Sequence, residues 1–139
     1  MNPACIYLPD TNVFSAYAKC AHAGLVSKLE TMEKDIVLSA IVLAEMEYGW
    51  RKAGVSTRRI RRQQAFAARL RPWVFDGDCA AAYGDVKNFL LHRLRPARPS
   101  GERDMPIAAH ALAIGAVLMT HNSREFEGIP GHDVEDWEK

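Results

Sequence analysis

Short apolar runs alternate along this chain with longer segments of helical character, and this alternation limits the fold more than any other feature. The first run, Cys5 to Pro9, ends at Asp10, where a segment with the pattern of a helix begins. Strands that alternate with helices predict a parallel sheet covered by helices on both faces. The sequence therefore predicts an α/β fold.

The expected elements follow from local pattern. Strands are expected over 4–9, 36–39, 73–75 and 116–120, with a last extended piece over 133–137, and helices over 11–19, 22–34, 40–53, 57–70, 78–94 and 104–114. Ser56 and Asp76 are expected to be N-caps, and Gly115 stands where a glycine ends a helix. A Pro-rich loop over 95–101 lies within the same unit, so residues 1–139 are expected to form a single domain.

Composition excludes several classes of protein. With 48% apolar and 25% charged residues, disorder is not expected, and no window has the length of a membrane span. The N-terminus lacks the basic and apolar regions of a secretory peptide, so we expect a cytoplasmic protein without membrane association. The three cysteines and five histidines show no paired spacing, which argues against a disulfide framework and a zinc site.

Basic residues are concentrated in one region although the formal net charge is only +1. So small a net charge argues against a protein that coats nucleic acid without sequence preference. A local basic stripe can still attract phosphates, or it can be a solvated helix face, and both interpretations stay open. The stripe consists of Arg51, Lys52, Arg58, Arg59, Arg61, Arg62, Arg69 and Arg71.

Three carboxylates stand at expected strand ends or helix starts. Asp10 ends the first strand, where open α/β sheets place their ligands. At 100° per residue, Glu45 shares a helix face with Val42 and Tyr48, on the stripe expected to face the core, whereas Glu47 points elsewhere. Asp104 begins an Ala-rich helix. Asp10 or Asp104 alone could be explained as a residue that caps or begins a helix. Glu45 is different, because no basic residue lies on its stripe to neutralise its carboxylate.

Together these acids predict a metal site. Hard oxygen ligands suit Mg²⁺ or Mn²⁺, and burying unpaired carboxylates is costly without a cation. Such an ion activates water and stabilises charge at a phosphate under attack. The residues Asp10, Glu45 and Asp104 therefore predict a metal-dependent phosphodiesterase.

The chain resembles the PIN-domain ribonucleases and, within them, the VapC toxins of bacterial toxin–antitoxin pairs. The resemblance spans nearly the whole sequence, and its motifs are specific in combination. They are Leu8 to Asn12, Ser39 to Gly49, Gly101 to Ala111, Leu118 to Phe126 and Ile129 to Trp137.

The resemblance implies a three-layer α/β/α PIN-like domain with a central, mainly parallel sheet that cleaves single-stranded RNA with Mg²⁺ or Mn²⁺. Asp10, Glu45 and Asp104 match the family's acidic metal ligands. Asn122 stands where many members have a further Asp, and another acid of the family falls on Glu125. We include Asn122 among the catalytic residues. Because it brings no negative charge, we expect one firmly bound ion.

The resemblance also implies partners: an RNA substrate, a VapB-like antitoxin, a second copy in a homodimer, and operator DNA reached only through the antitoxin. An apolar groove for the antitoxin is expected near Phe14, Tyr17 and Leu25, where core packing is an equal explanation.

Two other functions remain as alternatives. One is a PIN-fold binding protein with weak catalysis, which Asn122 keeps open. The other is a signalling module in which Asp10 accepts a phosphoryl group, although no acid precedes Asp10 and no Lys follows Thr120 at the later strand end.

Overall fold

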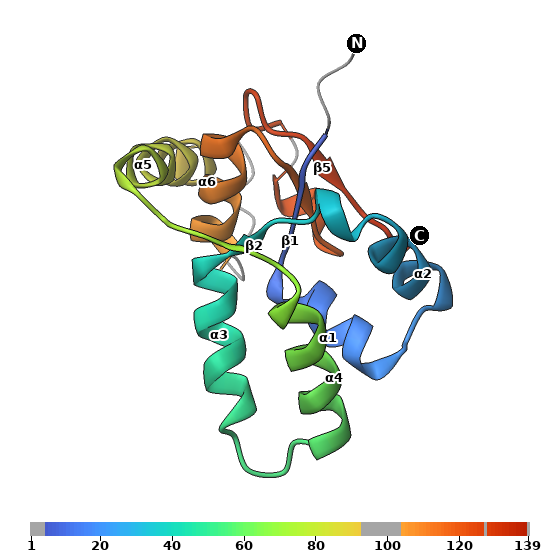
Figure 1. Ribbon diagram of the computed structural model, residues 1–139. Coiled ribbons are helices and arrows are strands. Elements are labelled where there is room, and N and C mark those ends of the chain that lie inside the picture. The colour runs from blue at the N-terminus through green and yellow to red at the C-terminus, as the bar shows by residue number, and fades with distance from the viewer. Residues whose placement is uncertain (1–4, 93–103, 127, 139) are drawn as a thin grey trace.

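A parallel sheet runs through the centre of the molecule in the computed structural model, which describes residues 5–92, 104–126 and 128–138 (Figure 1). Strand β4 pairs with both β1 and β5, and β2 pairs with β3, all in parallel. A parallel bridge between Tyr7 and Ile36 joins the two groups, which gives the order β3-β2-β1-β4-β5. The strands are β1 (Tyr7–Pro9), β2 (Leu38–Ser39), β3 (Pro72–Trp73), β4 (Val117–Met119) and β5 (Val134–Glu135).

Helices cover both faces of this sheet, with α5 and α6 on one side and α1, α2 and α4 on the other (Figure 1). Helices α3 and α4 lie side by side and extend beyond the sheet as a hairpin. The three-layer α/β/α prediction is therefore confirmed. The helices are α1 (Thr11–Lys19), α2 (Ala23–Thr31), α3 (Ala40–Trp50), α4 (Thr57–Ala68), α5 (Gly77–His92) and α6 (Asp104–Ile114), with 3₁₀ turns η1 (Glu33–Asp35) and η2 (Ser123–Phe126).

Several element bounds differ from the sequence prediction. The helix expected over 22–34 ends at Thr31, and its last residues form the separate turn η1. The strand expected over 36–39 begins only at Leu38, the one expected over 73–75 covers Pro72–Trp73, and the one expected over 116–120 covers Val117–Met119. The end of the helix expected over 78–94 and the Pro-rich loop over 95–101 lie outside the described residues.

Side-chain caps explain where the helices begin. Asp10 caps α1 and Ser39 caps α3, each by accepting a hydrogen bond from a backbone N–H of the first turn. The predicted caps Ser56 and Asp76 are confirmed at the starts of α4 and α5. Gly115 follows α6 with φ +70°, a conformation that favours glycine.

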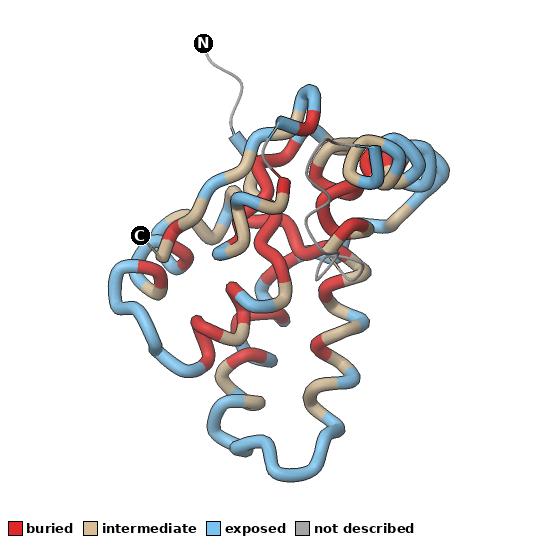
Figure 2. The backbone as a smooth tube through the Cα atoms, turned by 180° about the vertical axis from the view of Figure 1, so that it is seen from behind, coloured by how far each residue is buried: buried red, intermediate tan, exposed pale blue. Residues whose placement is uncertain are grey.

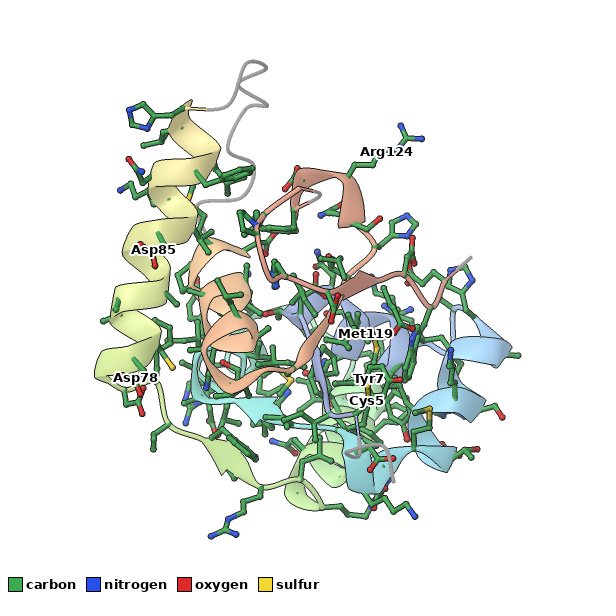
Figure 3. All side chains as sticks on the ribbon, turned by 90° about the horizontal axis from the view of Figure 1, so that it is seen from above. Cys5, Tyr7, Asp78, Asp85, Met119 and Arg124 are labelled. Atoms are coloured by element: carbon green, nitrogen blue, oxygen red, sulfur yellow. The ribbon has the colours of Figure 1, made fainter. Side chains whose placement is uncertain are left out.

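The core lies between the sheet and both helical layers, where buried residues follow the strands and the inward faces of the helices (Figure 2). Tyr7 and Met119 lie centrally, whereas Asp78 and Asp85 lie along the outer side of α5 (Figure 3). None of the described helices combines the length and the apolarity needed to cross a bilayer. Helices thus cover both faces of the sheet, and the residues at its carboxyl edge are left to form a site.

Candidate active site

A cleft of about 610 Å³ lies at the carboxyl edge of the sheet and brings together three of the predicted site residues. Glu45 comes from α3, Asp104 from the first turn of α6, and Asn122 from the turn after β4. Thr11, at the start of α1, lies between them and the strand end that carries Asp10. The topology thus gathers residues that are far apart in the sequence.

Asp10 is not among the described residues that line this cleft; it directly precedes the lining residue Thr11 and is 2% exposed. Its Oδ1 accepts a hydrogen bond from the Val13 N–H at 3.0 Å, and its Oδ2 accepts one from the Thr120 hydroxyl at 2.6 Å. The same Thr120 oxygen accepts the Asn122 N–H at 3.0 Å. Thr120 therefore links the carboxylate at the end of β1 to the amide residue after β4.

Burial raises the pKa of Asp10 above its usual value of 3.8, although the hydrogen bonds from Thr120 and Val13 act in the opposite direction. The nearby negative charge of Glu138 raises it further. Within the described chain no Lys or Arg forms an ion pair with Asp10. A buried carboxylate in this situation favours a bound cation or a proton.

Glu45 is half-buried and its Oε2 accepts a hydrogen bond from the Thr11 hydroxyl. Its neighbour Glu47 instead pairs with Arg51 at 2.6 Å on the other side of α3. The prediction that these two acids face different environments is thus confirmed. Tyr48 was expected on the core-facing stripe with Glu45, which is wrong: it is exposed, because this part of α3 extends past the sheet.

The three predicted metal ligands do not form a compact cluster among the described residues. Among the described residues, Asp10, Glu45 and Asp104 do not have ligand atoms that all lie within 4.8 Å of one another. Mg²⁺ commonly keeps several of its waters, so a site here would not require all three carboxylates to contact the ion directly. Asn122 lines the cleft, whereas Glu125 is not among its described lining residues. Glu125 lies in η2, where its backbone N–H donates a hydrogen bond to the Asn122 carbonyl at 3.1 Å.

A buried pair that the sequence did not predict supports two of the acids. The Ser39 hydroxyl lies 2.8 Å from His110 Nδ1, and its oxygen accepts the Ile41 N–H. Burial lowers the pKa of His110, which favours the neutral ring; in the tautomer with the proton on Nε2, Nδ1 accepts the Ser39 hydroxyl. The pair ties α6, which begins at Asp104, to the start of α3, which carries Glu45. The capping position of Ser39 was the only sign of it in the sequence.

A second group of ligand-type side chains lies near the chain's C-terminal end. His121 Nδ1 lies 2.8 Å from Glu138 and 3.3 Å from Asp136, and His22 lies 3.9 Å from Glu138. These contacts hold the last described residues beside the turn after β4. The scattered histidines of the sequence gave no indication of this cluster.

The basic stripe predicted from the sequence is divided in the structure. Arg51 and Arg69 form ion pairs with Glu47 and Glu33, and Arg62 packs over the Tyr17 ring. The exposed remainder on α4 is Arg58, Arg59 and Arg61. A second hollow, lined in part by Lys19, Lys52 and Arg59, shares Ser15, Gly49, Lys52 and Gln63 with the carboxylate cleft.

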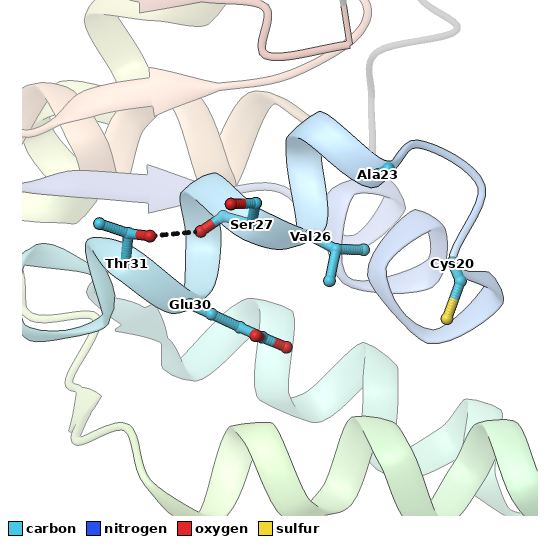
Figure 4. A pocket seen from close by; sticks show the side chains of 6 residues that line it. All are labelled: Cys20, Ala23, Val26, Ser27, Glu30 and Thr31. Atoms are coloured by element: carbon cyan, nitrogen blue, oxygen red, sulfur yellow. Dashed lines mark hydrogen bonds between the residues drawn. The ribbon is translucent and has the colours of Figure 1, made fainter.

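A further hollow lies between the end of α1 and α2 (Figure 4). Among its described lining residues Glu30 is the one carboxylate, and it accepts a hydrogen bond from Tyr17. With a single acid, this hollow lacks the several carboxylates of a metal-dependent site. The antitoxin groove expected near Phe14, Tyr17 and Leu25 is not formed by those residues, because all three are buried in the core.

Comparison with known proteins agrees with this geometry. The sequence profile of the family described as PIN domain matches residues 7–131. The chain is 34% identical to Ribonuclease VapC2 of Rickettsia felis over 137 residues, covering 96% of this chain and 99% of that protein. It is also 34% identical to the tRNA(fMet)-specific endonuclease VapC of Salmonella typhimurium, covering 94% and 97% of the two chains.

Solved structures show the same fold. VapBC2 from Rickettsia felis, bound to a DNA fragment from their promoter, contains a chain that superposes with a TM-score of 0.81 at 30% identity, covering 95% of this chain and 98% of that one. DNA-bound VapBC from Salmonella typhimurium gives a TM-score of 0.82 at 30% identity, with 96% and 99% covered. The likeness therefore extends over nearly the whole chain.

Proposed function

The chain belongs to the PIN domain family, and from this membership we propose that it is an endoribonuclease that acts as the toxin of a toxin–antitoxin pair. The observation that carries the proposal is the cleft in which Glu45, Asp104 and Asn122 meet beside the buried Asp10. Relatives named as ribonucleases are similar over nearly the whole chain. Two relatives named as tRNA(fMet)-specific make initiator tRNA the first substrate to try.

We assign Asp10, Glu45 and Asp104 as the residues that would hold a divalent cation, and these three with Asn122 as the catalytic residues. Their donor chemistry fits Mg²⁺ or Mn²⁺, because oxygen ligands surround the cleft and Asp10 has no cationic partner in the described chain. Such an ion, when bound, supplies a nucleophilic water and neutralises charge on the phosphate.

The chain's own residues prepare this site. The Val13 N–H and the Thr120 hydroxyl fix both oxygens of Asp10, and the Thr11 hydroxyl orients Glu45. Asn122 is held in place through its backbone N–H, which leaves its side chain to position the phosphate or a water. The signalling alternative, phosphoryl transfer to Asp10, is disfavoured because no acid precedes Asp10 and no Lys follows Thr120 at the later strand end.

The proposed partners are a VapB-like antitoxin, a second copy of the toxin, and operator DNA reached through the antitoxin. VapBC complexes bound to DNA are among the similar solved structures. A toxin that cleaves RNA acts where the RNA of the cell lies, so we propose a cytoplasmic location. We further propose that residues 1–139 form a single domain.

A matched pair of glutamates on α3 tests the proposed chemistry. Glu45→Gln should lower RNA cleavage at least a hundredfold, since a neutral amide replaces a charged ligand, whereas Glu47→Gln should retain activity because Glu47 pairs with Arg51 outside the site. The measurement is cleavage of initiator tRNA and of total RNA by antitoxin-free protein. Chelation should stop the reaction, and Mg²⁺ or Mn²⁺ should restore it.

Asp104→Asn serves as a second inactive variant in the same assay. Equal cleavage by the wild type, Glu45→Gln and Asp104→Asn would identify a contaminating nuclease and contradict the assignment. Expression of the wild type but not of the inactive variants should arrest growth, and co-expression of the cognate antitoxin should relieve the arrest.

Neutralising the exposed arginines of α4 should weaken RNA binding without changing which RNA is preferred. Replacing Arg58, Arg59 and Arg61 by Gln removes charges that can contact phosphates, so affinity should fall and the slope of log K against log salt should flatten by about two to three units. Binding titrations at several salt concentrations measure both effects.

Lys34→Gln is the control for that experiment, because Lys34 is an exposed cation in η1 and does not belong to the basic stripe. An unchanged salt slope in the α4 variant would assign that surface to solvent or to the antitoxin. Arg62 is left intact in the variant because its guanidinium lies 5.2 Å from the Tyr17 ring centroid and stabilises the fold.

A further inference from the structure

Tyr48 places an exposed aromatic ring in the wall of the carboxylate cleft. It lies one turn after Glu45 on α3, and both residues line the cleft. The residue is 66% exposed, so packing in the core does not explain the ring. A large apolar side chain left open beside catalytic acids is a candidate for contact with substrate.

Lys52 brings a positive charge to the same ring. Its Nζ lies 4.9 Å from the ring centroid, within the range of a cation–π contact, which restricts the ring while leaving it accessible. Lys52 also lines both the carboxylate cleft and the neighbouring basic hollow. The ammonium group therefore lies where the phosphates of a strand would pass as that strand extends away from the carboxylates.

Gln63, on α4, contributes hydrogen-bond donors to the cleft lining. It is 9% exposed, and its Oε1 accepts the Trp50 indole N–H at 2.6 Å. Because the indole nitrogen only donates, this bond identifies the amide oxygen and leaves the amide N–H groups as the polar atoms available to the cleft. Gln63 can thus meet an acceptor on a base, a ribose or a phosphate.

We propose that Tyr48, Lys52 and Gln63 form a nucleotide subsite beside the carboxylates, in which an unpaired base of the substrate RNA stacks on Tyr48. Lys52 neutralises the adjoining phosphate, and Gln63 donates to the same nucleotide. This inference rests on the proposed nuclease function and deepens it. Stacking on an aromatic ring is the usual way that proteins hold unpaired bases, so the RNA must be single-stranded next to the cut.

The surroundings favour RNA over a protein partner at this ring. The cleft that contains Tyr48 also contains the acids, and it shares four lining residues with a hollow that carries Lys19, Lys52 and Arg59. Acids at one end and cations along the continuation match a strand whose phosphate is cut at the acids and whose flank is held by charge. An antitoxin segment or a second copy on Tyr48 is a separate outcome of the test.

The test measures binding without cleavage, in the Asp104→Asn background. Short single-stranded RNA oligonucleotides carry an abasic ribose at each position in turn, and their affinities are compared for Tyr48 and Tyr48→Leu. Tyr48→Leu should weaken binding of intact RNA by roughly 5- to 150-fold, the range for one stacked base. Tyr48→Phe and Tyr48→Trp should stay within about threefold of the parent, since both keep a ring face.

One abasic position should weaken binding to the Tyr48 protein and cause no further loss in Tyr48→Leu, because both changes remove the same contact. Trp73→Leu, which replaces an exposed aromatic residue on β3, is the matched control and should bind normally. Equal affinity of Tyr48 and Tyr48→Leu for every oligonucleotide would overturn the proposal.

Two further outcomes separate the inference from its alternatives. A change in oligomeric state or in antitoxin affinity with unchanged RNA affinity would assign Tyr48 to a protein interface and also overturn the proposal. Absence of cleavage by the wild type would contradict the proposed function alone, because the stacking measurement uses a variant that is not required to cleave.

Discussion

Asp10→Asn should abolish cleavage and at the same time stabilise the metal-free protein. The substitution removes a charged ligand, so activity should fall roughly a thousandfold or more, given the several kcal/mol that a metal ion contributes to such a step. It also removes a negative charge that is 2% exposed and lacks a cation in the described chain. An amide fits the same place, since its oxygen can still accept the Val13 N–H.

The stability gain should depend on pH and on metal. Because the folded-state pKa of Asp10 is raised, the cost of its charge is fully present above that pKa and disappears as pH falls toward the usual value of 3.8. In EDTA near neutral pH, Asp10→Asn should melt roughly 2–5 °C above the wild type, a difference on the order of 1 kcal/mol. The difference should shrink at acidic pH, and also when Mg²⁺ stabilises only the wild type.

Differential scanning calorimetry with and without Mg²⁺ measures this crossover. Glu47→Gln is the control, because its carboxylate is paired at the surface and its loss should leave Tm and metal dependence nearly unchanged. A lower Tm for Asp10→Asn than for the wild type in EDTA would mean that the charge stabilises the fold, contrary to the cation-free burial described above.

Phe66→Ala should cause a large loss of stability and loosen one wall of the cleft. Phe66 is fully buried on α4, with its ring centroid 4.6 Å from that of Tyr17 and 6.0 Å from that of Phe14 on α1. Removing a buried Phe side chain costs about 3–5 kcal/mol, a large part of the 5–15 kcal/mol typical of a folded domain. Gln63 lies one turn earlier on α4 and lines the cleft, so RNA affinity should fall as well.

Urea unfolding followed by circular dichroism gives the stability change, and hydrogen exchange locates it. Amides of α4 should lose protection more than those of α5, because α5 packs against α6 on the opposite face of the sheet. Phe66→Leu, which keeps most of the buried volume, should cost about 1–1.5 kcal/mol. A loss below about 1 kcal/mol in Phe66→Ala would contradict the central role of this ring.

The sequence predicted the framework because local signals and the fold agree. The start at Asp10, the cap at Ser56 and the glycine at Gly115 each satisfy a short-range requirement of a helix end, which is visible in a single sequence. The inward position of Glu45 relative to Glu47 followed from helical periodicity. These features depend on neighbours within one or two turns.

Features that depend on distant contacts were not predictable. Helical periodicity placed Tyr48 in the core, because a wheel does not show where a helix outruns the sheet it covers. The hydrogen bond between Ser39 and His110 joins residues 71 positions apart, and the bond from Thr120 to Asp10 spans 110. The division of the basic stripe likewise required knowledge of which acids lie opposite each arginine.

The hairpin of α3 and α4 extends beyond the sheet, so its exposed cations lie apart from the acids at the sheet edge (Figure 1). Asp10 and Asp104 belong to the sheet and its covering helices, whereas Lys52 and the exposed arginines belong to the outer part of the hairpin. Because phosphate contacts carry no sequence information, substitutions at these outer positions would change how tightly RNA is held and not which RNA is preferred. The affinity for RNA can then be adjusted on the hairpin while Asp10 and Asp104, which lie outside it, keep their positions.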